Sequence, residues 1–239
     1  MRTILFLSLS ISLIFINQSC AQNWGRGVRG EGPNVEKSLK LDDFSGIKLT
    51  MAADVFLTQG DQQSVKIVGQ QNIIDLIETN VKDNVWKIKP SENVRNYDNL
   101  KIYITIPHLS YAKISGSGDI VSEGGFKNCK DLDLGISGSG GLKLDVDASN
   151  VHVGISGSGD IELSGQTSSL GLHISGSGDI DAMGMSCNDA DIHISGSGEC
   201  RVNVDKQLDV HVSGSGDVYY KGNPSVNSRI SGSGDLRSL

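Results

Sequence analysis

The sequence predicts an all-β protein that folds as a parallel β-helix, a solenoid in which each turn of chain stacks on the turn before it. Three observations predict this fold: one four-residue corner recurs, apolar and polar residues alternate between corners, and no helical period follows residue 113. Successive corners start 16 to 22 residues apart, whereas helical and leucine-rich repeats have longer units with a helical period inside them. The corner is Ser-Gly-Ser-Gly and stands at Ser115–Gly118, Ser137–Gly140, Ser156–Gly159, Ser175–Gly178, Ser195–Gly198, Ser213–Gly216 and Ser231–Gly234.

The segment before each corner has the pattern of a strand with one buried face. Apolar residues occupy every second position there, and many are β-branched, which suits a pleated surface. In stacked coils these residues would form inward columns, with neighbours about 4.8 Å apart. The alternating sets include Leu132, Leu134 and Ile136; Val151, Val153 and Ile155; Leu170, Leu172 and Ile174; and Leu208, Val210 and Val212.

The corner itself has residues that suit a sharp bend. Glycine adopts a positive φ without strain and lets neighbouring backbones approach closely. We expect the serine hydroxyls to satisfy backbone groups that the bend leaves unpaired.

The first third of the domain is less regular. We expect wider coils there that cap the N-terminal end of the core, since solenoids need atypical end units. A loop is expected at residues 90–99, and residues 72–77 fit either one helical turn or an irregular strand. A hairpin-like turn is predicted at Lys82-Asp83-Asn84, and strands near residues 47–51, 55–57, 65–67, 86–88 and 102–106.

The N-terminus predicts export. Residues 1–21 read as a signal peptide, with Arg2 followed by an apolar run from Ile4 to Ile16 that is too short to span a bilayer comfortably. Ser19-Cys20-Ala21 fits plain cleavage before Gln22, and it also fits a lipoprotein junction with Cys20 as the lipidation site. Both alternatives place the protein outside the cytoplasm, as an outer-membrane lipoprotein, a periplasmic protein or a secreted surface protein. Residues 22–41 are rich in glycine and predict a flexible tether, and residues 42–239 form the β-helix domain.

Composition narrows the classes of partner. The formal net charge is −7, which argues against nucleic acid and against an anionic membrane, so that only a lipid anchor would attach the chain to a bilayer. Apolar residues make up 37% and aromatic residues 5% of the chain, enough for a thin solenoid core built of aliphatic ladders. No evident cap closes the C-terminal end, which predicts either blunting by Arg237 or end-to-end, homo-oligomeric association.

An acid follows six of the seven corners. If the coils are in register, these acids stack in one column, and a cation could then bridge them; the calcium candidates are Asp160, Asp179 and Asp217. The alternative is that each acid caps its own corner by accepting backbone N–H groups. The spacing departs from the nine-residue calcium repeat of β-rolls, which favours the capping role and no cofactor. The six acids are Asp119, Asp160, Asp179, Glu199, Asp217 and Asp235.

Three histidines share one repeat position. His173, His193 and His211 each stand two residues before a corner, and Lys113 and Arg229 hold the same position in two other coils. By alternation this column points outward. Stacked imidazoles could bind zinc or copper, but rings on a flat sheet rarely converge on tetrahedral geometry, so we expect solvent-facing side chains.

The remaining cysteines do not predict a metal site. Cys129, Cys187 and Cys200 are an odd number without metal-ligand spacing, and the sequence does not decide whether two of them form a disulfide. Cys200 replaces an isoleucine on an inward column and is expected to be a small buried residue.

Nothing in the pattern predicts catalysis. A polysaccharide lyase needs acids grouped with a basic partner in a groove, and a serine hydrolase needs an acid–histidine pair at a defined offset. The corner also breaks the hexad of hexapeptide acyltransferases. A sugar-stacking platform or the core would account for the aromatic residues Trp24, Trp86, Tyr97, Tyr103, Tyr111, Tyr219 and Tyr220.

Several segments resemble one family over about residues 42–238. The Ile-Ser-Gly-Ser-Gly-Asp-Ile series, together with the segments quoted below, is similar to the putative auto-transporter adhesin, head GIN domain family of Bacteroidetes-type envelope proteins. The resemblance implies a right-handed single-stranded β-helix without catalytic residues, and adhesion at the cell surface. The matching segments are Phe44-Ser-Gly-Ile-Lys-Leu, Val55-Phe-Leu-Thr-Gln-Gly-Asp, Val65-Lys-Ile-Val-Gly and Leu100-Lys-Ile-Tyr-Ile-Thr-Ile-Pro-His-Leu.

The expected function is therefore that of a non-enzymatic exported envelope protein, which acts in adhesion or presents a ligand on its β-helix. Its expected partner is a surface protein or a glycan. The alternative is a carbohydrate-binding or carbohydrate-processing β-helix protein of the envelope.

Overall fold

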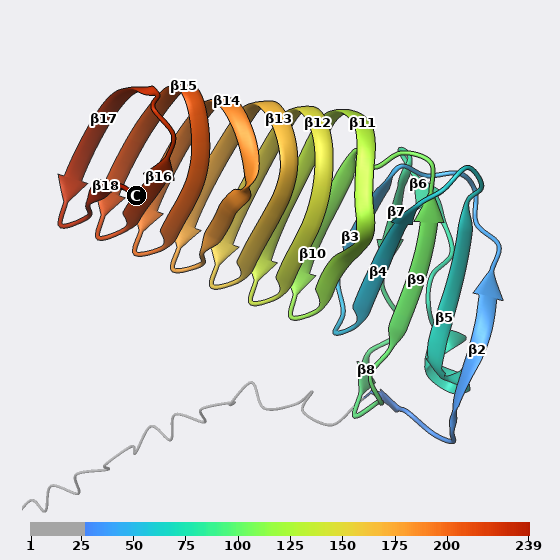
Figure 1. Ribbon diagram of the computed structural model, residues 1–239. Coiled ribbons are helices and arrows are strands. Elements are labelled where there is room, and N and C mark those ends of the chain that lie inside the picture. The colour runs from blue at the N-terminus through green and yellow to red at the C-terminus, as the bar shows by residue number, and fades with distance from the viewer. Residues whose placement is uncertain (1–26) are drawn as a thin grey trace, which may run out of the picture.

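The computed structural model describes residues 27–239 and is a β-solenoid of about seven turns, with 70% strand and 2% helix. Figure 1 shows the regular coils stacked side by side in a row, with the less regular N-terminal strands at one end. The predicted all-β solenoid is confirmed. No helix within residues 27–239 is long and apolar enough to cross a membrane.

Each regular coil is one long strand that runs around a bend from one corner to the next. Equivalent strands pair in parallel with no crossing of the order, so that each coil touches only its two neighbours. These strands are β11 (Asp119–Gly138), β12 (Gly141–Gly157), β13 (Asp160–Gly176), β14 (Ile180–Gly196) and β15 (Glu199–Gly214). The chain continues through β16 (Asp217–Lys221), β17 (Ser225–Gly232) and β18 (Leu236–Ser238).

The bend divides the solenoid into two faces. We call the strand halves that follow a corner the acidic face; it contains residues 119–123, 141–147, 160–166, 180–186, 199–205 and 217–221. We call the halves that precede a corner the histidine face; it contains residues 111–116, 131–138, 150–157, 169–176, 189–196, 207–214 and 225–232.

The inward columns are as the alternation predicts. Ile136, Ile155, Ile174 and Ile194 pair in register from coil to coil, and each is at most 2% exposed. Because every second residue points inward, one register fixes both the core and the outer columns.

Backbone contacts, not serine side chains, hold the corners together. The first glycine of each corner has a positive φ, for example 137° at Gly196, and its carbonyl accepts a bond from the second serine of the next coil. Ser197 N donates to Gly176 O at 2.9 Å and Ser215 N to Gly196 O at 2.8 Å. Within residues 27–239 no corner serine hydroxyl makes a hydrogen bond to the protein, so the expected role of these hydroxyls is not seen.

The N-terminal strands extend both faces. On the acidic face β4 (Asp54–Gln59) pairs in parallel with β11 and with β9 (Lys101–Ile106). On the histidine face β3 (Gly46–Leu49) pairs in parallel with β10 (Tyr111–Gly116) and with β7 (Val85–Ile88).

The outermost strands are antiparallel, which the sequence did not predict. On the acidic face β5 (Ser64–Gln70) pairs with β9, and β2 (Asn34–Leu39) pairs with β5. Residues 34–39, assigned from composition to a flexible tether, instead form this edge strand. Half-buried Val35 and Leu39 pack against the core, and ion pairs such as Glu36–Lys66 at 3.3 Å lie on the outer side.

Large apolar side chains cover the N-terminal end of the solenoid. Trp86 is fully buried and donates from Nε1 to Glu78 O at 2.9 Å, and its ring lies 5.8 Å from that of Phe44. The single helical turn α1 (Gln71–Ile74) contributes two more buried isoleucines, and the predicted hairpin is β6 (Val81–Lys82) with β7. A separate two-stranded sheet joins β1 (Val28–Arg29) and β8 (Val94–Arg95).

Candidate functional surfaces

The acids that follow the corners lie in one column, as predicted. Asp119 pairs with Gly141 and Glu199 with Asp217 in the register of the acidic face. The column continues at Asp54 in the N-terminal strands, where the sequence offers no corner to reveal it.

Three of the six acids bind the backbone of the next coil, and not their own corner as the capping alternative supposed. Asp119 Oδ1 accepts from Gly141 N at 2.8 Å, Asp179 Oδ1 from Glu199 N at 2.7 Å and Asp217 Oδ1 from Asp235 N at 2.8 Å. Each of these carboxylates accepts from a backbone N–H at or next to the first residue of a strand, where the regular hydrogen bonds between neighbouring strands begin. The acids therefore help to stack the corners.

The three calcium candidates are not gathered into a site. Asp179 and Asp217 each hold a backbone N–H, and Asp160 and Asp179 line a groove of about 390 Å³ with Lys143 and Glu162. Within residues 27–239 no group of three or more histidine, cysteine or acidic side chains is arranged to hold a metal ion. Calcium binding, the alternative that the sequence pattern did not favour, is tested by calorimetric titration with calcium. The candidate lipidation site Cys20 lies outside the described residues.

The histidine column forms and points outward, as expected. The rings of His193 and His211 stack at 5.0 Å, and those of His173 and His193 lie 6.5 Å apart. His193 Nε2 is 3.2 Å from Asp191 Oδ1. In register, the column continues to Arg229 at one end and, through two glycines, to Lys113, Lys48 and Lys87 at the other. Sequence spacing did not reveal Lys48, because it lies before the first corner.

Two hollows lie along the histidine face. One of about 480 Å³ is lined by Lys48, Lys113, Gly135, Gly154 and His173, together with serines of the corners. A second, of about 300 Å³, begins at the same His173 and runs past His193 and His211 to Arg229.

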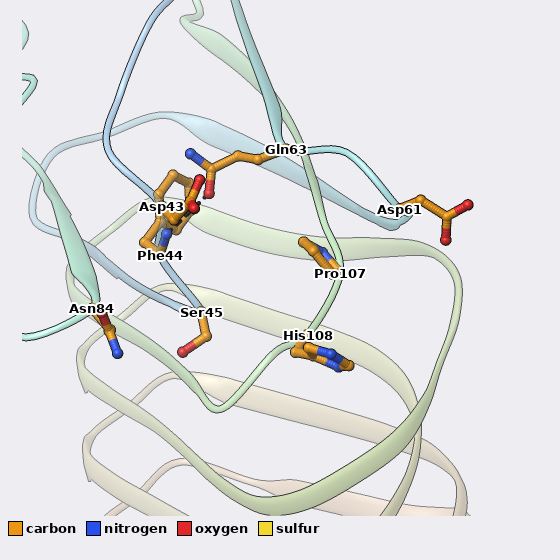
Figure 2. Close-up of a pocket in the computed structure, with 8 residues that line it drawn as sticks. All are labelled: Asp43, Phe44, Ser45, Asp61, Gln63, Asn84, Pro107 and His108. Carbon is orange, nitrogen blue, oxygen red and sulfur yellow. Dashed lines mark hydrogen bonds between the residues drawn. The ribbon is translucent and has the colours of Figure 1, made fainter.

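A third pocket, of about 310 Å³, lies where the N-terminal strands meet the first coil (Figure 2). Figure 2 shows Gln63 directed towards Asp43 and Phe44, whereas Asp61 lies apart from them. Gln63 Oε1 accepts from Phe44 N at 3.0 Å, and Gln63 Nε2 donates to Asp42 O at 2.9 Å. The polar groups at this end are thus engaged in holding the loop. His108 also lines the pocket, and no hydrogen bond joins it to an acid among the described residues.

The three cysteines within residues 27–239, Cys129, Cys187 and Cys200, are buried and free. Burial raises the pKa of the Cys187 thiol to about 12, and it raises the pKa of Cys200 still further. Cys187 Sγ donates to Asn203 O at 3.3 Å. Such thiols are poor nucleophiles, because the thiolate is the reactive form. In the part of the chain that the structure describes, no serine or cysteine side chain donates to a histidine.

The fold and these surfaces define a class: a β-solenoid with an aliphatic core and long polar outer columns. The model of the family described as putative auto-transporter adhesin, head GIN domain, matches residues 43–224, and the chain belongs to this family. The resemblance in the sequence is therefore confirmed. No protein in the set of curated proteins matches the chain.

Solved structures share the whole fold. A putative adhesin from Bacteroides fragilis is 28% identical, with a TM-score of 0.84 over 89% of this chain and 100% of that one. A putative adhesin from Parabacteroides distasonis is 25% identical, with a TM-score of 0.71 over 90% of this chain and 100% of that one. A putative lipid binding protein from Parabacteroides distasonis is 23% identical, with a TM-score of 0.73 over 90% of this chain and 100% of that one, and that likeness concerns the fold alone.

Proposed function

We propose that the protein is a non-enzymatic envelope protein that presents the outer columns of its solenoid to a surface protein or a glycan, as an adhesin does. The observation that supports this most directly is the difference in side-chain chemistry between inward and outward positions of each coil. Inward positions are almost all apolar, whereas outward positions are mostly polar and form columns that neighbouring coils keep in register. Such a surface offers one ligand many equivalent contacts. Family membership agrees with an adhesin-like, extracytoplasmic role.

The test is a binding screen of the purified protein against cells, matrix proteins and glycans, together with attachment of a strain that lacks the gene. Saturable binding that is lost on unfolding would support the proposal. Unchanged attachment of the deletion strain, combined with no binding in the screen, would contradict it.

A second candidate function, carbohydrate binding, is favoured by one aromatic pair on the acidic face. The rings of Phe56 and Tyr103 stack at 5.0 Å and 16°, both are partly exposed, and Lys66 Nζ lies 5.3 Å from the centre of the Tyr103 ring. Stacked aromatic rings that are partly exposed offer apolar surface to a sugar, and the neighbouring lysine can donate to a sugar hydroxyl. If this pair binds a glycan, Phe56→Ala lowers the affinity at least about tenfold; an unchanged affinity would dismiss it.

A further inference from the structure

The histidine face carries two hollows that follow one another along a single outward column. The hollows of about 480 Å³ and about 300 Å³ both have His173 in their lining, so they are adjacent, and we refer to the two together as the hollow. The part of the column that lines them crosses eight strands in register, which spans about 34 Å at about 4.8 Å per strand. Its members are Lys48, Lys113, Gly135, Gly154, His173, His193, His211 and Arg229.

Two glycines create the deeper part of the hollow. Gly135 and Gly154 stand where the other coils carry a long side chain. Between Lys113 and His173 the hollow is therefore lined by backbone, and no side chain of the column fills it. A Cβ at Gly154 would meet no atom within 4 Å and its φ is not positive, so the fold does not require glycine at this position.

The hollow is basic along its floor. Every side chain in the column is cationic or a histidine, although the whole chain has a formal net charge of −7. Serines of the corners line one side of it, and the hydroxyls of those serines make no hydrogen bond to the described protein. They are therefore available to a ligand that carries hydroxyl groups of its own.

Carboxylates lie along the other side of the column, and one of them, Asp133, also lines the larger hollow. Asp133 Oδ2 lies 2.7 Å from Lys113 Nζ, and Asp191 lies beside His193. Asp209 accepts from Gln207 and Asn227, and these two bonds lower its pKa, so that it stays ionised. A polymer of phosphates would be repelled by this row of carboxylates, whereas a sugar acid can place its anionic group on the bases and donate its hydroxyls to the acids.

We propose that this hollow binds a linear acidic polysaccharide, one whose sugars carry carboxylate groups, along the axis of the solenoid. This inference rests on the proposed function and names the ligand class for one of its surfaces. Charge complementarity with the column selects the anionic sugar, and the regular spacing of the coils suits a polymer with a regular repeat.

The test measures binding of the full protein to polygalacturonate by calorimetry, with fully methyl-esterified polygalacturonate as the uncharged probe. We expect binding to the acidic polymer only. Replacing His173, His193 and His211 together by Gln should weaken that binding at least about tenfold, because these side chains line the hollow. Equal binding of both polymers would overturn the proposal.

Two single variants locate the site. Gly154→Glu fills the hollow and adds a negative charge on a backbone that accepts a side chain, and should weaken binding at least about tenfold. Lys127→Gln is the matched control, because Lys127 is exposed at a bend away from the histidine face, where it contacts Asp147. Full affinity of Gly154→Glu, with a normal melting temperature, would overturn the proposal.

The outcomes separate this inference from the proposed function. Glycan binding that Phe56→Ala removes and Gly154→Glu does not would overturn the inference and leave the proposed function in place. Single-stranded DNA that binds as tightly as polygalacturonate would also overturn the choice of ligand. Failure of every ligand in the screen and in this test would count against both.

Discussion

At the scale of single residues, Gly196 and Gly154 of the histidine face differ in whether the fold requires glycine at their position. Gly196 has a φ of 137°, and a Cβ there would lie 2.1 Å from Gly176 O, so both conformation and space exclude a side chain. Gly154 has neither restriction.

We therefore predict that Gly196→Ala lowers the free energy of unfolding by about 2–4 kcal/mol, whereas Gly154→Ala changes it by less than about 1 kcal/mol. Chemical denaturation monitored by circular dichroism measures both values. Equal effects of the two substitutions would show that the corner tolerates a side chain and that the stacking geometry is wrong.

The buried thiols give a second prediction at this scale. A folded-state pKa raised by burial means that the folded protein holds its protons more tightly than the unfolded chain. The resulting stability is complete below the ordinary thiol pKa of about 8.5 and is lost as pH rises towards 12. Cys200→Val, which restores the aliphatic type of the inward column, should remove part of this loss.

The measurement is the melting temperature of the wild type and of Cys200→Val between about pH 7 and pH 11. The difference between the two proteins should grow in favour of the variant as pH rises, because titration of tyrosines and lysines is common to both. A constant difference across this range would refute the role of the thiol.

At the scale of elements, the acids after the corners act on the strand that follows. Asp179 accepts from the backbone of Glu199, whereas the Asp160 carboxylate accepts no hydrogen bond from the described protein, and Asp160 N instead donates to Gly140 O. Asp160 N has no carboxylate partner because the equivalent position in the preceding coil is Gly141, which has no side chain.

This contrast predicts that Asp179→Ala costs about 1 kcal/mol of stability and that Asp160→Ala costs close to none. Asp179→Asn keeps a carbonyl acceptor and should recover most of the loss. Hydrogen exchange at the Glu199 amide provides the local readout and should accelerate only in Asp179→Ala. Unchanged exchange there would mean that the bond contributes nothing to corner stacking.

The strands that the sequence predicts well are those with strict alternation. From Ile114 onward one period fixes both the inward columns and the outward histidines, so the structure adds little beyond the corner contacts. The edge strand β2 could not be predicted in this way, because a strand with half-buried residues such as Val35 has the same local pattern as a polar linker. The strand β5 was expected near residues 65–67, but its antiparallel pairing was not.

The candidate surfaces were predictable only where the repeat carries them. His173, His193 and His211 share a fixed offset from their corners, and their stacking follows from it. Lys48 and Asp54 join the same columns through β3 and β4, whose loops have lengths that no repeat constrains. The hollow exists because Gly135 and Gly154 align with Lys113 and His173 in neighbouring coils. This strand register is known only from the structure.

At the scale of the whole molecule, stability should be divided among nearly equivalent coils. Each coil pairs only with its neighbours, and Val153 in β12 is equivalent to Leu172 in β13. Deleting residues 153–171 joins His152 to Leu172 and removes one whole coil without disturbing the alternation. We predict a shorter solenoid that keeps its β-sheet circular dichroism and melts cooperatively, because coil interfaces in a solenoid are nearest-neighbour contacts.

Deleting residues 153–172 is the control. It removes one further residue and joins His152 to His173, so that two outward positions become adjacent. A strand shifted by one residue turns its apolar side chains to solvent, and this variant should lose most of its stability or fail to fold. Similar melting of the two deletions would show that alternation does not set the register of the coils, and would undermine the outer columns on which both proposed binding surfaces depend.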